Sequence, residues 1–223
     1  MNEEKTWFMK DEYVLGIEGV LDLPDAHFHR LLEDAGADLT SLGVQSNLGL
    51  FYEVAKRYDK ALDWYHRGAR QGCEYCENDI GICYRHGHGV EQNIDTALEW
   101  YTKSAEKGHA VAQNNAGVVH HEKGQHEEAF KWYTKAAEQG HAGAQNSVGC
   151  IHNDKEQYEE AFKWYMKAAN QGFTDAAVNL GIYYADGLGV EKNIPEAIKW
   201  YAKAAEKGDT YAAEVLEELT SRE

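Results

Sequence analysis

Small and apolar residues recur along this chain at spacings that place them on one side of a helix. Within residues 141–152, Ala144, Val148 and His152 lie four residues apart, and Gly149 directly follows the apolar eighth position. A spacing of four matches the 3.6-residue turn of an α-helix, so the pattern predicts one helix with a buried stripe.

The residues that follow have an apolar pattern of their own. Ala161 leads into the pair Trp164-Tyr165, and the segment ends at Gly172. Small alanines beside large aromatics predict a second helix whose side chains interlock with neighbouring layers, each buried aromatic contributing roughly 2–3 kcal/mol. The closing glycine is a common left-handed stop of a helix.

This two-helix pattern is repeated along most of the chain. The Trp-Tyr pair recurs at 64–65, 100–101, 132–133, 164–165 and 200–201, which defines the five repeats 41–72, 73–108, 109–140, 141–172 and 173–208. Three repeats have 32 residues, and two have 36 because of the longer turns "RHGHGVEQN" (85–93) and "ADGLGVEKN" (185–193). A period in this range is typical of a helical solenoid.

A glycine also stands at the ninth position of every repeat, inside the predicted first helix: Gly49, Gly81, Gly117, Gly149 and Gly181. Glycine in a helix interior costs roughly 1 kcal/mol relative to alanine. Five glycines in register therefore predict that a neighbouring helix approaches closely at this position.

The order of these residues resembles the Sel-1-like repeat, a relative of the tetratricopeptide repeat. The shared features are a small residue, Leu-Gly, Tyr, Gly-x-Gly-Val, Ala, Trp-Tyr, Ala-Ala and Gly, over about residues 41–208, although the 32-residue repeats lack the Gly-x-Gly-Val turn. The resemblance implies an all-α fold, a right-handed superhelix (solenoid) of five antiparallel helix pairs. It also implies a concave face that holds a protein partner, and no catalytic chemistry.

Both ends of the chain depart from the repeat. Residues 1–40 are expected to form an acidic helical segment or cap, with an amphipathic helix over 24–36 and an apolar stretch over 7–21 that docks elsewhere. An arm folded into the groove is the alternative for this segment. Residues 209–223 restart a first helix and then become acidic, which predicts a C-terminal capping helix.

The charge of the chain narrows the choice of partner. The 223 residues include 22 basic and 38 acidic side chains, a formal net charge of −16. Nucleic acid and anionic membranes need a positive face, so this charge argues against both as partners. An acidic surface usually serves solubility alone; the alternative is that the acidic ends attract a basic partner, such as a toxin that this protein neutralises.

The cysteines and the N-terminus suggest a compartment. The N-terminus begins with acids and has no apolar run of signal-peptide length, and no stretch approaches the ~20 apolar residues that span a bilayer. Four cysteines without a secretory signal then predict a cytoplasmic protein with free thiols. The oligomeric state is open, with a monomer slightly favoured.

We expect the partner to bind the side of the first helices opposite the core stripe. Asparagines at the sixth position of three successive repeats would form a ladder of amides able to pair with an extended peptide backbone: Asn78, Asn114 and Asn146. Apolar tenth positions run beside the ladder, and variable thirteenth positions add polar contacts: Leu50, Ile82, Val118 and Ile182, then Glu53, Arg85, His121, Asn153 and Ala185. Alternatively, the asparagines cap or bridge helices, and the apolar strip packs between neighbouring first helices.

A second hypothesis is a metal- or thiol-dependent protein. It rests on the "CEYC" motif with Cys73 and Cys76, and on a histidine-rich edge with His86, His88, His120 and His121. However, Cys76 and Cys83 are separated by about 10 Å along one helix, and zinc ligands lie within about 2.3 Å of the ion. No strand pattern typical of thioredoxin surrounds the motif. We therefore predict no metal, no cofactor and no catalytic residues, and a non-catalytic scaffold or adaptor.

Overall fold

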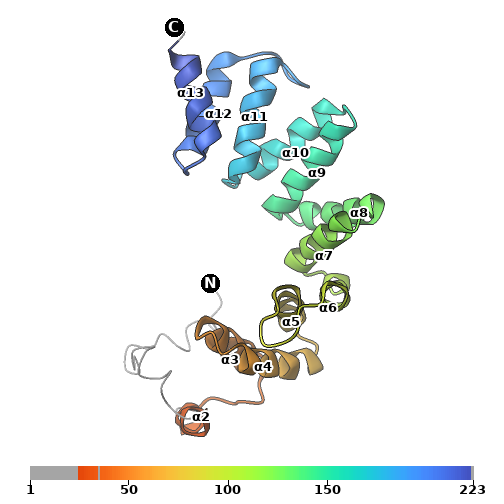
Figure 1. Ribbon diagram of the computed structural model, residues 1–223, viewed down its shortest axis with the longest axis vertical. Helices are drawn as coiled ribbons and strands as arrows, with labels where there is room; N and C mark the ends of the chain where they lie inside the picture. The colour runs from red at the N-terminus through yellow and green to blue at the C-terminus, as the bar shows by residue number, and fades with distance from the viewer. Residues whose placement is uncertain (1–24, 35, 222–223) are drawn as a thin grey trace. The chain divides into compact units, whose positions relative to one another are not determined.

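The computed structural model describes residues 25–34 and 36–221, and throughout these residues the secondary structure is helical (Figure 1). The apolar stretch 7–21 and its expected docking lie outside the described residues. In chain order the helices are α2 (Asp25–Asp34), α3 (Leu42–Val54), α4 (Tyr58–Arg70), α5 (Glu74–His86), α6 (Ile94–Glu106), α7 (Ala110–Glu122), α8 (His126–Glu138), α9 (Ala142–Asp154), α10 (Tyr158–Asn170), α11 (Thr174–Asp186), α12 (Ile194–Ala205) and α13 (Thr210–Thr220). Consecutive helices pack in pairs, so the chain is the all-α solenoid that the repeat predicts.

The chain divides into two compact units, Met1–Ser104 and Ala105–Glu223. In the first unit, α2 packs against the helix pair of the first repeat. The ring of Phe28 stacks on Phe51 of α3 at 4.9 Å, and Asp25 accepts hydrogen bonds from Tyr52 (3.1 Å) and Arg57 (2.6 Å). These contacts fix α2 over the outer end of the first repeat, where a solenoid needs a cap.

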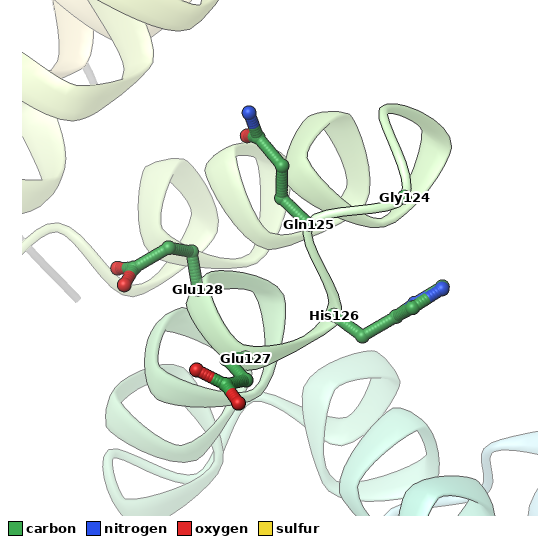
Figure 2. Close-up of a pocket in the computed structure, with 5 residues that line it drawn as sticks. All are labelled: Gly124, Gln125, His126, Glu127 and Glu128. Atoms are coloured by element: carbon green, nitrogen blue, oxygen red, sulfur yellow. The ribbon is translucent and has the colours of Figure 1, made fainter.

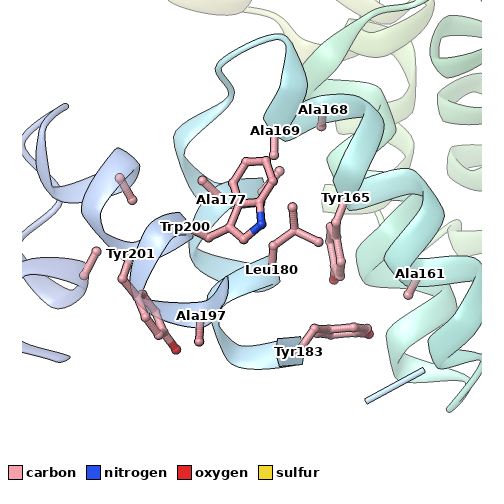
Figure 3. Packing of buried hydrophobic residues seen from close by; sticks show 13 residues of the cluster. Ala161, Tyr165, Ala168, Ala169, Ala177, Leu180, Tyr183, Ala197, Trp200 and Tyr201 are labelled. Atoms are coloured by element: carbon pink, nitrogen blue, oxygen red, sulfur yellow. The ribbon is translucent and has the colours of Figure 1, made fainter. Parts of the chain in front are cut away.

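In the second unit the core consists of interlocked small and large side chains. Figure 3 shows Leu180 of α11 between the rings of Tyr165 from α10 and Trp200 from α12, with alanines such as Ala168 and Ala197 around them. Leu180 and both alanines are fully buried. Alanine leaves room for the aromatic rings of neighbouring helices, so the alternation of sizes seen in the sequence becomes close packing between layers.

The ninth-position glycines allow the two helices of each repeat to touch. A Cβ atom on Gly149 would lie 2.6 Å from the ring of Tyr165, and one on Gly181 would lie 2.7 Å from the ring of Tyr201. Gly49, Gly81 and Gly117 face Tyr65, Tyr101 and Tyr133 in the same way. The expected close approach is confirmed, and the approaching helix is the second helix of the same repeat.

The tryptophan of each Trp-Tyr pair lies beneath a cation three residues further on. The Nζ atom of Lys135 is 4.2 Å from the ring centroid of Trp132, and that of Lys167 is 3.7 Å from the ring of Trp164. The same pairing occurs for Trp64 with Arg67, Trp100 with Lys103, and Trp200 with Lys203. The cations therefore lie over rings that are buried (Trp64 and Trp200) or partly exposed (Trp100, Trp132 and Trp164), and each such pair contributes about 0.5–1 kcal/mol at an exposed site.

The longer turns of the 36-residue repeats contact the preceding repeat. Gly89 has φ +74°, and a Cβ there would lie 2.6 Å from the carbonyl carbon of Tyr58, the first residue of α4. Gly189 lies against the backbone of Tyr158 at the start of α10 in the same way. The second glycine of Gly-x-Gly-Val therefore lets two backbones meet between repeats, a contact that the 32-residue repeats lack the turn to make.

We predict opposite effects for two glycine-to-alanine substitutions in α9. Gly149→Ala should destabilise the protein by about 1–3 kcal/mol, because the overlap with Tyr165 outweighs the helix propensity gained. At Gly143 a Cβ would meet the side chain of His141 at 3.3 Å and the ring of Phe173 at 3.7 Å, an ordinary contact distance. Gly143→Ala should therefore be neutral or stabilising by up to about 1 kcal/mol. Urea unfolding measures both, and stabilisation by Gly149→Ala would contradict the packing described here.

Candidate functional site

The expected partner-binding residues differ widely in exposure. In the second compact unit, His121 is exposed and the others are partly buried: Asn114, Val118, Asn146, Asn153 and Ile182. In the first unit, Leu50 is 56% exposed, Ile82 and Arg85 are partly buried, and Asn78 is only 4% exposed. Residues in the same register of the repeat thus present very different surfaces.

The asparagines of the expected ladder take part in contacts within the protein. The Asn179 amide on α11 donates to Oδ1 of Asn146 on α9 at 3.2 Å, which joins the first helices of adjacent repeats. Asn78 is buried and donates to Oδ1 of Asp79 at 3.1 Å. The bridging alternative therefore describes Asn146, and Asn78 offers almost no amide surface to a partner. Asn114 is the ladder residue for which the peptide-binding interpretation keeps most force.

The apolar tenth positions separate into two groups. Val118 and Ile182 pack against buried clusters of the second unit, as the alternative interpretation of the strip expects. Leu50 instead stays exposed, and Val54, one turn further along α3, is 66% exposed. At the tenth and fourteenth positions, exposed apolar side chains are therefore confined to the first repeat.

Two thirteenth-position residues accept hydrogen bonds from buried tyrosines, one from the next repeat and one from the same repeat. The Tyr183 hydroxyl on α11 donates to Oδ1 of Asn153 on α9 at 2.8 Å. In the first repeat, the Tyr65 hydroxyl of α4 donates to Oε2 of Glu53 at 2.5 Å. The thirteenth position thus lies where a first helix meets the hydroxyl of a buried tyrosine, and its residue type changes from repeat to repeat.

Pairs of glutamines, each with one buried and one exposed member, are a structural feature that our sequence analysis missed. The fifth-position amides of Gln45 and Gln145 donate to the main-chain oxygens of Leu39 (3.0 Å) and Ala137 (3.1 Å), and Gln113 donates to Ala105 (3.1 Å). Ala105 and Ala137 lie in the last turns of α6 and α8, and their carbonyls also accept the backbone N–H groups of Gly108 and Gly140. Gln71, Gln139 and Gln171 donate in turn to the fifth-position glutamines at 2.7–2.8 Å. The signal was present, since glutamine recurs at positions five and thirty-one of these repeats.

The second repeat has acids where its neighbours have amides. Glu77 replaces the fifth-position glutamine; it is fully buried and lies 3.2 Å from Nζ of Lys103. Asp79 occupies the seventh position, which elsewhere holds Asn47, Asn115, Ser147 and Asn179. Burial, with the nearby charge of Glu53, raises the pKa of Asp79 to about 6 even though the Asn78 amide donates to it. Asp79 therefore carries a charge at neutral pH at a cost that asparagine would not have.

The CxxC motif of the second repeat forms a helix cap. Cys73 is the N-cap of α5, and its Sγ accepts the backbone N–H of Cys76 at 3.1 Å. Ser41, His141 and Asp209 cap α3, α9 and α13 through the residue three positions on. The thiol of Cys76 lowers the pKa of Cys73, and so does the hydrogen bond from the backbone N–H of Cys76. Burial acts in the opposite direction but does not outweigh them. Both cysteines are buried. Cys73 caps the helix and Cys76 fills the small-residue position of the core, which explains why the two cysteines are three residues apart.

The histidine-rich edge also contains structural contacts. Nδ1 of His120 lies 2.6 Å from Oε1 of Gln125, and His152 makes the same contact with Gln157 at 2.7 Å. A cavity of about 530 Å³ lies at the turn between α7 and α8, and is lined by Gly124, Gln125, His126, Glu127 and Glu128. Figure 2 shows these side chains pointing in different directions, so they do not converge on one bound atom.

Two further features bear on the alternatives. Within residues 25–34 and 36–221, no group of three or more His, Cys, Asp or Glu side chains is arranged to hold a metal ion. In the same part of the chain, no helix is long and apolar enough to cross a membrane. Among the side chains that the sequence analysis considered for metal or thiol chemistry, Cys73 caps a helix and His120 bonds to Gln125 across a turn.

Comparisons with known proteins agree with this architecture. The Sel1 repeat model matches residues 44–73, 75–109, 110–141, 144–173 and 174–209. A Sel1 repeat protein from Oxalobacter formigenes is 38% identical, with 77% of this chain and 74% of that chain covered and a TM-score of 0.70. The protective antigen c5321 of uropathogenic Escherichia coli, which has an SLR fold, is 30% identical with a TM-score of 0.75, covering 92% of this chain but 45% of the antigen. No curated protein matches the sequence significantly.

An immunity protein from Pseudomonas aeruginosa, Pa5087, shares the fold at 24% identity, with 70% of this chain and 61% of that chain covered and a TM-score of 0.51. The fold and the buried inter-repeat contacts define a helical-repeat protein. The chain belongs to the Sel1 repeat family, as the sequence pattern indicated. Proteins of this family generally serve as scaffolds for protein–protein interaction and are typically non-catalytic.

We predict that Asp79→Asn stabilises the protein in a pH-dependent way. Because the pKa of Asp79 in the folded protein (about 6) lies above the ordinary aspartate value of 3.8, wild-type stability falls as pH rises between these values. The substitution removes that loss, so it should add about 1–3 kcal/mol at pH 7.5 relative to its effect at pH 4. Urea unfolding at the two pH values measures this difference.

Asp63→Asn is the matched control for this prediction, since Asp63 is exposed on α4 in the same compact unit. It should show no comparable gain between pH 4 and pH 7.5. An Asp79→Asn effect of the same size at both pH values would mean that burial does not hold the proton on this carboxyl.

Proposed function

We propose that this protein is a non-catalytic adaptor that binds a partner protein, or an extended peptide of it. The partner binds to the side of the first helices that lies opposite the core stripe. The observation that carries the proposal is the contrast between positions that repeat and positions that vary. Repeated residues, such as the ninth-position glycines and the fifth-position glutamines, hold the helices together. The thirteenth position changes from Glu53 to Arg85 and His121 in successive repeats.

This contrast separates stability from recognition. Packing demands the same side chain at the same place in each repeat, whereas recognition of an irregular partner needs a different one at each place. The exposed His121 and the partly exposed Asn114 lie on α7, within the second compact unit. An amide offers both a donor and an acceptor, which suits the backbone of an extended chain.

The net charge indicates the kind of partner. At −16, long-range attraction favours a basic protein, and a toxin is one example. The same charge argues against nucleic acid. Two residues of the metal- or thiol-dependent alternative have structural contacts instead: Cys73 caps α5, and His120 bonds to Gln125. These contacts favour the adaptor proposal over that alternative.

Site-specific photo-crosslinking tests the proposal. A photoreactive residue placed at Asn114 or His121 should crosslink to a partner in a lysate of the source organism. The same residue at Lys131 or Lys163, which are exposed on the second helices α8 and α10, is the control. We expect at least about tenfold more crosslinked partner from the first-helix positions, because near-contact is needed for the reaction. Equal yields from both sets, or a higher yield from the second helices, would contradict the proposed face.

A further inference from the structure

The first repeat exposes an aliphatic pair that the other repeats do not. Leu50 and Val54 lie one turn apart on α3 and are 56% and 66% exposed. At the fourteenth position, where the first repeat has Val54, the later repeats have polar or charged residues: His86, Glu122, Asp154 and Asp186. A valine in this exposed position gains nothing from folding, so its presence calls for a contact outside the described structure.

Two acids lie next to this pair, again as departures from the repeat. Glu53 follows Leu50 by three residues, a spacing that places these two side chains on one face of α3. Glu53 is held by the Tyr65 hydroxyl at 2.5 Å, and Asp79 of α5 lies within reach of its charge. No other repeat has an acid at position thirteen or at position seven.

The combination has an energetic consequence. Two carboxylates that are close together and partly buried repel each other, and burial deprives them of water. The Tyr65 hydroxyl, which donates to Glu53, and the Asn78 amide, which donates to Asp79, are both neutral. A cation brought by a partner would offset the repulsion, and aliphatic groups on the same partner would cover Leu50 and Val54.

We propose that Leu50, Glu53 and Val54 of α3, with Asp79 of α5, form an acidic–aliphatic patch that binds a basic amphipathic segment of the partner. An arginine of that segment reaches Glu53 and Asp79, and aliphatic side chains one helical turn away rest on Leu50 and Val54. Arginine suits the place better than lysine, because its planar fork bonds to two carboxylate oxygens while its stem packs on apolar groups. This inference rests on the proposed function and assigns the chemistry of the partner.

The test uses the full chain and a defined probe. The probe is a fluorescent amphipathic helical peptide with arginine and leucine on one face, and matched peptides replace arginine by glutamine or leucine by serine. Fluorescence anisotropy should show saturable binding of the arginine–leucine peptide, with at least about tenfold weaker binding of both matched peptides. No binding, or equal binding of the three peptides, would overturn the proposal.

Variants of the patch locate the binding. Glu53→Gln with Asp79→Asn, and separately Leu50→Ser with Val54→Ser, should each weaken peptide binding about tenfold or more. Glu127→Gln with Glu159→Gln removes the same charge from exposed acids of α8 and α10 and should leave the affinity unchanged. The changed side chains of α3 are exposed or partly exposed, and circular dichroism with thermal unfolding checks that each variant is folded. Equal weakening by the control pair would mean that only net charge matters, and the patch would be rejected.

Two more outcomes separate this inference from others. The photoreactive residue at position 121 can be combined with the patch variants. If these variants capture as much partner as the protein with an unchanged patch, the patch proposal fails and the adaptor proposal stands. If no position of the first helices crosslinks, the adaptor proposal itself fails. Concentration-dependent dimerisation that Leu50→Ser with Val54→Ser abolishes would assign the patch to a second copy of this chain, and would overturn the basic-segment proposal.

Discussion

The contact on which each repeat depends is the ring of a tyrosine lying against the bare backbone of a glycine. Tyr165 occupies the space that a Cβ on Gly149 would need, and the other four repeats have the same pair. This contact sets the separation of the two helices, so alanines are the size that fits between layers, and a cation lies over each tryptophan ring. The intrinsic helix propensity lost at glycine is offset by burial of an aromatic ring.

Joining the repeats depends in part on side chains that reach the end of the preceding second helix. In the third and fourth repeats Gln113 and Gln145 donate to the carbonyls of Ala105 and Ala137, and Gln171 donates in turn to the oxygen of Gln145. A hydrogen bond of this kind contributes about 1 kcal/mol. In the second repeat the fifth position is Glu77, which is buried and pairs with Lys103, so an ion pair stands where Gln113 and Gln145 use amides.

Departures from the repeat are therefore informative about function. Where packing requires a residue, the repeats agree; where they disagree on the surface, packing does not decide the choice. Val54, Glu53 and Asp79 depart together within the first two repeats, in a position where exposure and charge both oppose stability. An asparagine in place of Asp79 would make the second repeat resemble its neighbours, so packing alone does not account for this acid.

The sequence by itself determined the helix pairs, their order, the glycine contact and the family, because each follows from local spacing repeated five times. For the candidate site, the sequence indicated only which side of the first helices it occupies, because position in the repeat fixes which way a side chain points from its own helix. Which of those side chains reach solvent was decided by the tertiary structure. Asn78 and Asn114 share a register, yet Asn78 is buried; Leu50 and Ile182 share another, yet Leu50 is exposed. The physical reason is that burial depends on what the neighbouring helix brings to the contact, and that neighbour differs at every step of the solenoid.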